Sequence, residues 1–154
     1  MLPIVHAATP WQIAQARALI LEYQKALGID LGFQDFEQEM AGFPGAYAPP
    51  GGRLLLALDG SDAAGCVGVR ELESGTCEMK RLYIRPAYRS HGLGRRLVEA
   101  AVEQARAAGY SAMCLDTLPQ MGAAIRLYEA FGFERTEPYY ANPISGALFF
   151  KLRL

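Results

Sequence analysis

The sequence contains no long apolar run. No segment of its 154 residues approaches the ~18 consecutive apolar residues that a membrane-spanning helix requires. The first residues, MLPIVHAATPWQIAQ, also lack the basic start and apolar run of a secretory signal. We therefore expect a soluble, unprocessed protein that does not act at a membrane.

Cysteine is scarce. The three cysteines, Cys66, Cys77 and Cys114, are odd in number and show no CxxC spacing. This pattern argues against a disulfide framework and against a zinc site. A reducing, cytoplasmic setting and a protein without a metal are the expectation.

An excess of charge of either sign is absent as well. Fifteen Lys and Arg residues face sixteen Asp and Glu residues, for a net charge of −1. Nothing global points to nucleic acid or to an acidic membrane as a partner. With 51% hydrophobic and 20% charged residues and no internal repeat, the chain is expected to form one globular domain over residues 1–154.

Turn and cap signals divide the chain into strands and helices. Thr9 is predicted to cap a helix that begins at Pro10 and ends before Gly28. Strands are expected at 3–7, 53–58, 63–72, 76–84, 111–116, 133–137 and 147–153, further helices at 93–108 and 122–131, and a Gly- and Pro-rich loop at 42–52. A right-handed crossover over 76–116 would make its two strands parallel, so the fold class is α+β: a mixed, mainly antiparallel sheet flanked by helices.

Acidic residues are missing between Glu78 and Glu99, where six cations occur: Lys80, Arg81, Arg85, Arg89, Arg95 and Arg96. We expect this excess of positive charge to be local and its cations to be unpaired. Gly92 and Gly94 stand at the first turn of the predicted helix, where each glycine costs ~1 kcal/mol relative to alanine. Bare backbone N–H groups surrounded by arginines suit a phosphate group. A Gly-rich turn on a solvated basic helix stays open as the alternative.

The common nucleotide motifs do not fit this stretch. A dinucleotide fingerprint would need glycine where Leu97 stands, and the preceding strands form an antiparallel meander rather than βαβ units. The Walker pattern GxxxxGK[ST] is absent.

Two motifs instead resemble those of the GNAT superfamily of N-acetyltransferases. The run EMKRLYIRPAYRSHGLGRRLVEAAVEQARAAG is similar to its acyl-CoA motif, whose pattern [QR]xxGx[GA] is matched by Arg89, Gly92 and Gly94. The family's LYExxGF element is matched by Leu127, Tyr128, Glu129, Gly132 and Phe133. The resemblance covers roughly residues 53–153, and the two elements in this order are more specific than either alone.

The resemblance implies a GNAT acyl-CoA N-acyltransferase fold with a central pair of parallel, splayed strands, and acetyl-CoA as co-substrate. In this family the backbone of the strand before the glycines binds the pantetheine arm and the loop amides bind the pyrophosphate. The corresponding residues here are Leu82, Tyr83, Ile84, Arg89, Ser90, His91, Gly92, Leu93, Gly94 and Arg95. Met121 stands where many relatives carry an asparagine that contacts the arm.

Acyl transfer to an amine requires two proton transfers. A lysine-like amine with a pKa of ~10.4 is protonated at pH 7, so a base or a water relay must remove a proton. Glu78 stands where the family often places this base; a surface glutamate that balances Lys80 and Arg81 is the alternative. Tyr128 occupies the family's tyrosine position and is expected to protonate the departing thiolate; without the motif it would be a packing residue.

The acceptor amine is expected beside Tyr139, Tyr140 and Asn142, in the turn before the last strand. Aromatic residues at the N-terminal side, Trp11, Tyr23, Phe33 and Tyr47, are expected to wall the same pocket or to belong to the core. Such walls suit a small amine or an amino-acid-like molecule.

Three functions are compatible with these residues. The leading hypothesis is transfer of acetyl from acetyl-CoA directly to a primary amine of a small or amino-acid-like molecule. A peptide or protein N-acetyltransferase would need an open groove where 33–52 and 138–146 meet, and a catalytically idle acyl-CoA-binding sensor would need neither Glu78 nor Tyr128. A homodimer through the apolar segment GALFFKLRL also stays open.

Overall fold

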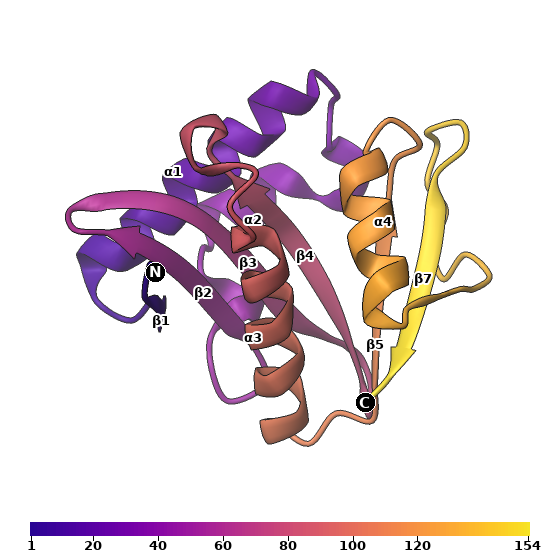
Figure 1. The fold of residues 1–154 in the computed structure, drawn as a ribbon. Helices are drawn as coiled ribbons and strands as arrows, with labels where there is room; N and C mark the ends of the chain where they lie inside the picture. Colours follow the sequence, from indigo (N-terminus) through magenta and orange to yellow (C-terminus); the bar gives the residue numbers. More distant parts are fainter.

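The centre of the protein is one mixed β-sheet (Figure 1). The computed structural model describes the backbone of residues 1–154 and every side chain except that of Phe33. Seven strands lie in the order β1-β2-β3-β4-β5-β7-β6. They are β1 (Ile4–His6), β2 (Arg53–Asp59), β3 (Asp62–Glu73), β4 (Thr76–Ile84), β5 (Ala112–Thr117), β6 (Glu134–Arg135) and β7 (Leu148–Arg153). All neighbours pair antiparallel except β4 and β5, which are parallel as the crossover predicted.

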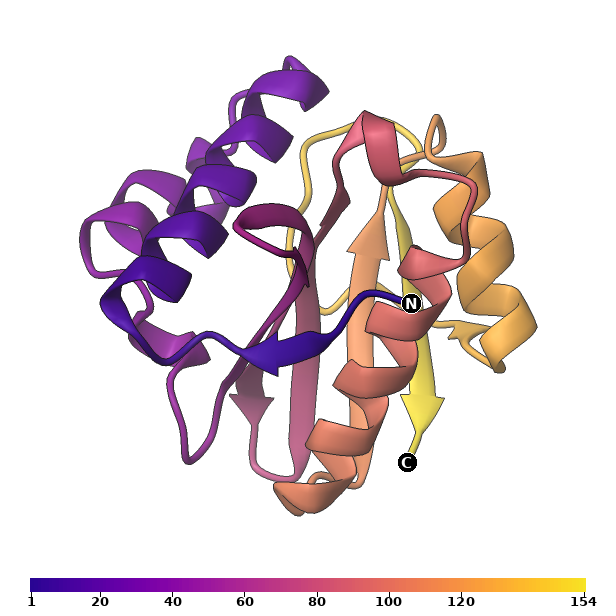
Figure 2. The same cartoon turned by 60° about the vertical axis from the view of Figure 1, so that its left-hand side comes forward.

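Helices cover both faces of the sheet (Figure 2). The helices α1 (Pro10–Leu27) and α2 (Phe36–Ala41) lie on one face, and α3 (Leu93–Ala107) and α4 (Gly122–Phe131) lie on the other. Among the residues that the structure describes, none of these helices combines the length and the apolar character needed to cross a bilayer.

The alternation of strand side chains explains why two apolar layers form. In β2, Leu54 and Leu56 pack into the cluster beneath α1, whereas Leu55 and Ala57 pack into the cluster beneath α3. Successive side chains of a strand point to opposite faces, so a run such as LLLA supplies both layers at once. The sheet therefore holds a core on each side.

Local cap chemistry sets the bounds of α1 as predicted. The Thr9 side chain accepts a hydrogen bond from the Gln12 N–H at 3.1 Å, and the Gln12 side chain accepts one from the Thr9 N–H at 3.1 Å. Gly28 ends the helix with a φ of 66°, a conformation in which glycine carries no Cβ penalty.

The segment between α1 and β2 is more ordered than the sequence indicated. The prediction of a loop over 42–52 is wrong in part, because a 3-10 helix at Gly45–Tyr47 lies within it. No element was predicted between Gly28 and Gly42, where the structure has a 3-10 helix at Gly32–Gln34 and the helix α2. Buried side chains of Phe36, Met40 and Tyr47 tie this segment to the face covered by α1.

The parallel strands β4 and β5 pair only at one end. The ladder runs from Thr76–Ala112 to Glu78–Cys114 and stops there, although both strands continue. The β3–β4 register shifts beyond this point, and Arg81 has a φ of 61°, which is unusual within a strand. The strands consequently separate toward the end at which α3 begins (Figure 1).

Candidate active site

Three neighbouring cavities lie along β4, and the middle one occupies the gap between β4 and β5. The loop cavity, about 660 Å³, lies beside residues 89–94 and the start of α4. The cleft cavity, about 70 Å³, lies between the separated ends of β4 and β5. The polar cavity, about 520 Å³, contains Glu78. The loop and cleft cavities share Tyr23, Leu27, Leu82, Met121 and Ala124, and the cleft and polar cavities share Gln34 and Lys80.

The loop cavity is bounded by the first turn of α3. The backbone N–H groups from Ser90 to Arg95 have no hydrogen-bond acceptor among the described residues. A Cβ on Gly92 would meet no atom within 4 Å, and one on Gly94 would meet only Leu127, at 3.7 Å. Unpaired amides, a helix N-terminus and open space together make a site for an anion.

The structure brings together most of the residues predicted to bind the cofactor. Eight of them line the loop cavity: Leu82, Tyr83, Ile84, Arg89, Ser90, Gly92, Leu93 and Gly94. His91 is exposed and is not among its lining residues. Arg95 also lies outside the cavity wall; its Nε is 3.2 Å from Glu99 Oε1 and its guanidinium covers the Phe131 ring.

Most of the basic cluster between Glu78 and Glu99 is paired, so the expectation of unpaired cations is wrong. Arg81 makes two bonds to Glu39 of α2, at 2.9 and 3.0 Å, and Arg85 is bound to Glu22 of α1. These acids come from segments more than 40 residues earlier in the chain. Arg89 and Arg96 remain without a carboxylate partner among the described residues.

The cleft cavity contains Tyr128, which α4 directs toward the gap between the strands. The side chain is 6% exposed and packs edge-on against the Phe133 ring. Burial raises the pKa of the Tyr128 hydroxyl above its ordinary value, so it keeps its proton at neutral pH. No atom of the described residues accepts a hydrogen bond from this hydroxyl, and the proton is therefore free for another acceptor.

Asp116, at the end of β5, holds a second group of polar side chains in the cleft cavity. The Tyr140 hydroxyl donates to Asp116, and the Asn142 side chain donates to the same carboxylate at 3.1 Å. Gln34 donates to Tyr140 at 2.9 Å and accepts from Arg81 at 2.8 Å. This network lies where the cleft and polar cavities meet, so it separates them.

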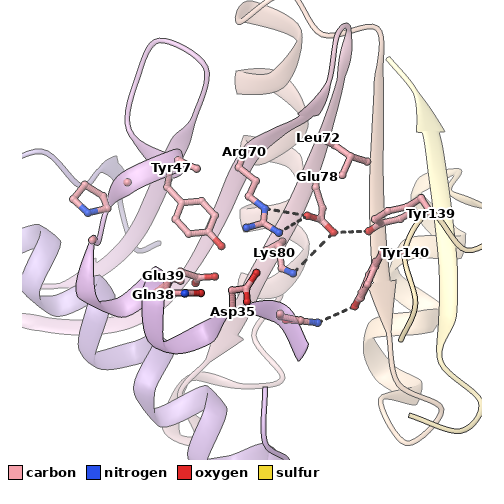
Figure 3. Close-up of a pocket in the computed structure, with 15 residues that line it drawn as sticks. Asp35, Gln38, Glu39, Tyr47, Arg70, Leu72, Glu78, Lys80, Tyr139 and Tyr140 are labelled. Carbon is pink, nitrogen blue, oxygen red and sulfur yellow. Dashed lines mark hydrogen bonds and ion pairs between the residues drawn. The ribbon is translucent and has the colours of Figure 1, made fainter. Parts of the chain in front are cut away.

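The polar cavity holds Glu78 in a fixed orientation (Figure 3). Its Oε1 lies 3.0 Å from both Nε and Nη2 of Arg70, and its Oε2 accepts a hydrogen bond of 2.6 Å from Tyr139. Glu78 is only 1% exposed, which excludes the surface role considered above; Arg81, moreover, pairs with Glu39 instead. Burial and the Glu78 carboxylate raise the pKa of Tyr139, which keeps it a donor.

Lys80 lies in the wall that the polar and cleft cavities share. Its side chain is 4% exposed, and its Nζ is 4.0 Å from Glu78 Oε2. Burial lowers the pKa of Lys80 to about 8, against the opposing effect of Glu78. The side chain is therefore a buried cation at neutral pH, with the Glu78 carboxylate at a distance of 4.0 Å.

A comparison with known protein families identifies the family of this chain. The model of the Acetyltransferase (GNAT) family matches residues 14–133. The chain belongs to the GNAT acetyltransferase family. An N-acetyltransferase of Schizosaccharomyces pombe, itself uncharacterised, is 42% identical over 147 residues, which are 94% of this chain and 90% of the relative.

Solved structures agree with this GNAT fold. An acetyltransferase from Streptococcus agalactiae superposes with a TM-score of 0.79 at 23% identity, over 99% of this chain and 98% of its own. A structure from Salmonella typhimurium, determined with its cofactor acetyl-CoA, superposes with a TM-score of 0.70 at 21% identity, over 99% and 93% of the two chains. The predicted family and its mixed sheet with splayed parallel strands are confirmed.

The predicted acceptor residues of the GNAT chain divide between two cavities. Tyr139 and Tyr140 line the polar cavity, and Asn142 lines the cleft cavity. Of the aromatic residues expected nearby, Tyr47 lines the polar cavity and Tyr23 lines the other two, whereas Trp11 is 44% exposed on α1. Phe33 lies outside the described side chains.

Sequence reasoning missed several residues of these cavities. Arg70, Gln34 and Asp116 are not among the site residues that the sequence predicted. A local signal for the partner of Glu78 lies in the β3–β4 hairpin, where Arg70 is on the facing strand, although a register shift decides that Arg70 rather than Glu71 stands opposite Glu78. No comparable local signal marks Gln34, whose partners Arg81 and Tyr140 are 47 and 106 residues away. Within the described part of the chain, no group of three metal-ligating side chains occurs.

Proposed function

We propose that this GNAT chain transfers the acetyl group of acetyl-CoA directly to the primary amine of a small molecule. One observation carries the proposal: three adjacent cavities with shared walls lie in sequence beside the unpaired loop amides, the gap between β4 and β5, and a buried carboxylate. Such an arrangement suits a long co-substrate that enters from one side and an amine that enters from the other.

The loop cavity fits a pyrophosphate and a pantetheine arm. Free N–H groups from Ser90 to Arg95 can bind phosphate oxygens, and the missing side chains of Gly92 and Gly94 leave room for them. The solved relative from Salmonella typhimurium with acetyl-CoA supports the same choice of co-substrate. Leu82, Tyr83 and Ile84 stand beside the cavity as the backbone that would bind the arm.

Glu78 and Tyr128 have suitable positions for the two proton transfers. Glu78 would accept the proton that the amine loses as its nitrogen bonds to the acetyl carbon. Tyr128 would supply a proton to the sulfur as the carbon–sulfur bond breaks. The two residues line adjacent cavities rather than one, which matches an acceptor and a thioester arriving from opposite sides.

A small acceptor suits the polar cavity better than a protein surface does. Its volume of about 520 Å³ is within the usual range for small-molecule sites. A peptide acetyltransferase remains a distinct outcome of the experiment, as does an acyl-CoA sensor.

The test is a mass-spectrometric screen of amines with acetyl-CoA and purified protein. The proposal predicts N-acetylated small amines in addition to released coenzyme A. Acetylation confined to peptides would show that the acceptor is a peptide rather than a small amine. Binding of acetyl-CoA without any transfer would favour an acyl-CoA sensor.

A further inference from the structure

The polar cavity contains a buried hydroxyl that nothing in the described part of the chain satisfies. Tyr47 is 1% exposed, and its hydroxyl has no hydrogen-bond partner among the described residues. Burial and the Glu39 carboxylate raise the pKa of Tyr47, so the hydroxyl keeps its proton. A buried donor without an acceptor costs free energy, which a bound acceptor would recover.

The backbone of β3 fixes where this hydroxyl lies. A Cβ on Gly68 would come within 2.7 Å of the Tyr47 ring, so the ring rests directly on the strand at this glycine. Arg70 follows two residues later on the same face of β3, and Lys80 stands opposite Gly68 on β4. In Figure 3 the hydroxyl of Tyr47 lies between the Arg70 guanidinium and the Glu39 carboxylate, and Lys80 stands farther along the same wall of the cavity.

Two cations that line the same cavity as the hydroxyl keep donors available. Arg70 binds Glu78 through Nε and Nη2, and its Nη1 donates to no atom of the described residues. Lys80 lies 4.0 Å from Glu78, too far for a hydrogen bond. Tyr47, Arg70 and Lys80 thus present donors and positive charge to one cavity, on the side opposite Tyr139 and Tyr140 (Figure 3).

We propose that Tyr47, Arg70 and Lys80 form a subsite for a carboxylate of the acceptor, so that the acceptor is an amino-acid-like molecule carrying both an amine and a carboxylate. The inference rests on the proposed function only for the acetylation of the amine. The carboxylate subsite concerns ligand binding, which can be measured without any transfer. It narrows the acceptor from amines in general to zwitterions.

The charges of the cavity favour a monoanion. Asp35, Glu39 and Glu78 line the cavity together with Arg70 and Lys80, and the acid Glu39 is already bound by Arg81. A ligand group with two negative charges would be repelled by these carboxylates and would find too few cations to balance it. A carboxylate, with one negative charge, can be bound by the donors that Tyr47, Arg70 and Lys80 leave available. The ammonium of the same molecule would find Glu78 within the cavity.

The experiment compares matched sets of amines on the whole protein. One set is leucine, leucinamide and 3-methylbutylamine; a second is phenylalanine, phenylalaninamide and 2-phenylethylamine. Calorimetry in the presence of coenzyme A measures binding, and mass spectrometry measures acetylation. We expect the amino acid of at least one set to bind at least about tenfold more tightly than its amide and its decarboxylated amine.

Tyr47→Phe isolates the subsite. Because the lost hydroxyl makes no hydrogen bond among the described residues, the variant should fold normally and lose the preference for the amino acid over the amide by about tenfold. Tyr110→Phe, which removes a hydroxyl bound to Gly51 O outside the three cavities, is the matched control and should keep the preference.

The outcomes separate this inference from the proposed function. Equal binding of the three members of every set, or an unchanged preference in Tyr47→Phe, would overturn the carboxylate subsite even if amines are acetylated. A carboxylate preference that depends on Tyr47, without acetylation of any amine, would uphold the subsite and overturn the proposed transfer.

Discussion

Arg70 stands directly opposite Glu78 in the β3–β4 ladder and holds one of its carboxylate oxygens through two nitrogens, each at 3.0 Å. Tyr139 holds the other oxygen at 2.6 Å. A carboxylate fixed in this way cannot rotate freely, so the amine of the acceptor must approach it from a fixed direction. Glu78 thereby becomes a positioned base in the proposed reaction rather than a mobile one.

Glu78→Gln should lower turnover at neutral pH by at least about 100-fold, because glutamine accepts hydrogen bonds but cannot remove the amine proton. Activity should recover toward alkaline pH, where more of the acceptor is already deprotonated. The measurement is the pH–rate profile with acetyl-CoA in excess. Glu71→Gln, an exposed change on β3, is the control. An unaltered profile in Glu78→Gln would assign the base role to water or another residue.

Tyr128→Phe should lower turnover while leaving the affinity for acetyl-CoA nearly unchanged. The Tyr128 hydroxyl makes no hydrogen bond among the described residues, and the ring contacts with Phe133 and Phe150 persist in phenylalanine. The melting temperature should therefore stay close to that of the native chain, as thermal unfolding will check. Unchanged turnover would remove Tyr128 from the mechanism.

Gly94→Glu should abolish acetyl-CoA binding without harming the fold. A Cβ at Gly94 meets only an ordinary contact at 3.7 Å, and replacing a helical glycine adds up to about 1 kcal/mol of stability. The carboxylate would project into the loop cavity, where the pyrophosphate is expected. Gly92 is the poorer test, because its φ of 76° would strain any side chain.

Calorimetric titration with acetyl-CoA and thermal unfolding check the two parts of the Gly94 prediction. Gly94→Ala, which adds a methyl group without charge, is the matched control and should retain measurable binding. Full binding by Gly94→Glu would mean that the co-substrate lies elsewhere.

Lys80 should make the stability of the protein depend on pH in an alkaline range. Its pKa of about 8 in the folded chain lies below the ordinary 10.5, so the unfolded chain binds more protons between these values. The free energy of unfolding should therefore rise, on the order of 2 kcal/mol, between pH 7.5 and 9.5. The charges of Glu78, Arg81, Arg70 and Asp116 also act on Lys80.

Urea unfolding at the two pH values, compared with Lys80→Met, measures this contribution. The native chain should gain stability relative to the variant as pH rises. A constant difference between the two proteins would contradict the lowered pKa.

Much of the fold follows from short-range signals in the sequence. Thr9, Pro10 and Gly28 bound α1 through their own side chains and backbone, and these effects act within one turn. The helix α2 escaped prediction because its six residues bury only Phe36 and Met40, too few for a periodic pattern. Its stability comes from the packing of these residues against the sheet.

The candidate site was harder to predict from the sequence than the fold, because the residues that interact within it are distant from one another in the chain. The glycines at 92 and 94 could be interpreted from their neighbours, but Arg81 and Glu39 meet across 42 residues. An irregular register in the β3–β4 hairpin makes the partner of Glu78 harder still to predict. A regular ladder continued from Glu73–Thr76 would place Glu71 opposite Glu78, and the bulge beyond this pair brings Arg70 there instead. The ion pair between Arg70 and Glu78 therefore was not predicted, and the expected partners of Glu78 were Lys80 and Arg81.

The proposed transfer requires that acetyl-CoA bind at the loop amides and β4. Calorimetric titration of the native chain with acetyl-CoA, with NAD as a control ligand, is the measurement to make first. We expect selective one-to-one binding of acetyl-CoA that is lost in Gly94→Glu and retained in Tyr128→Phe. No binding of acetyl-CoA by the native chain, or equal binding by Gly94→Glu, would contradict it.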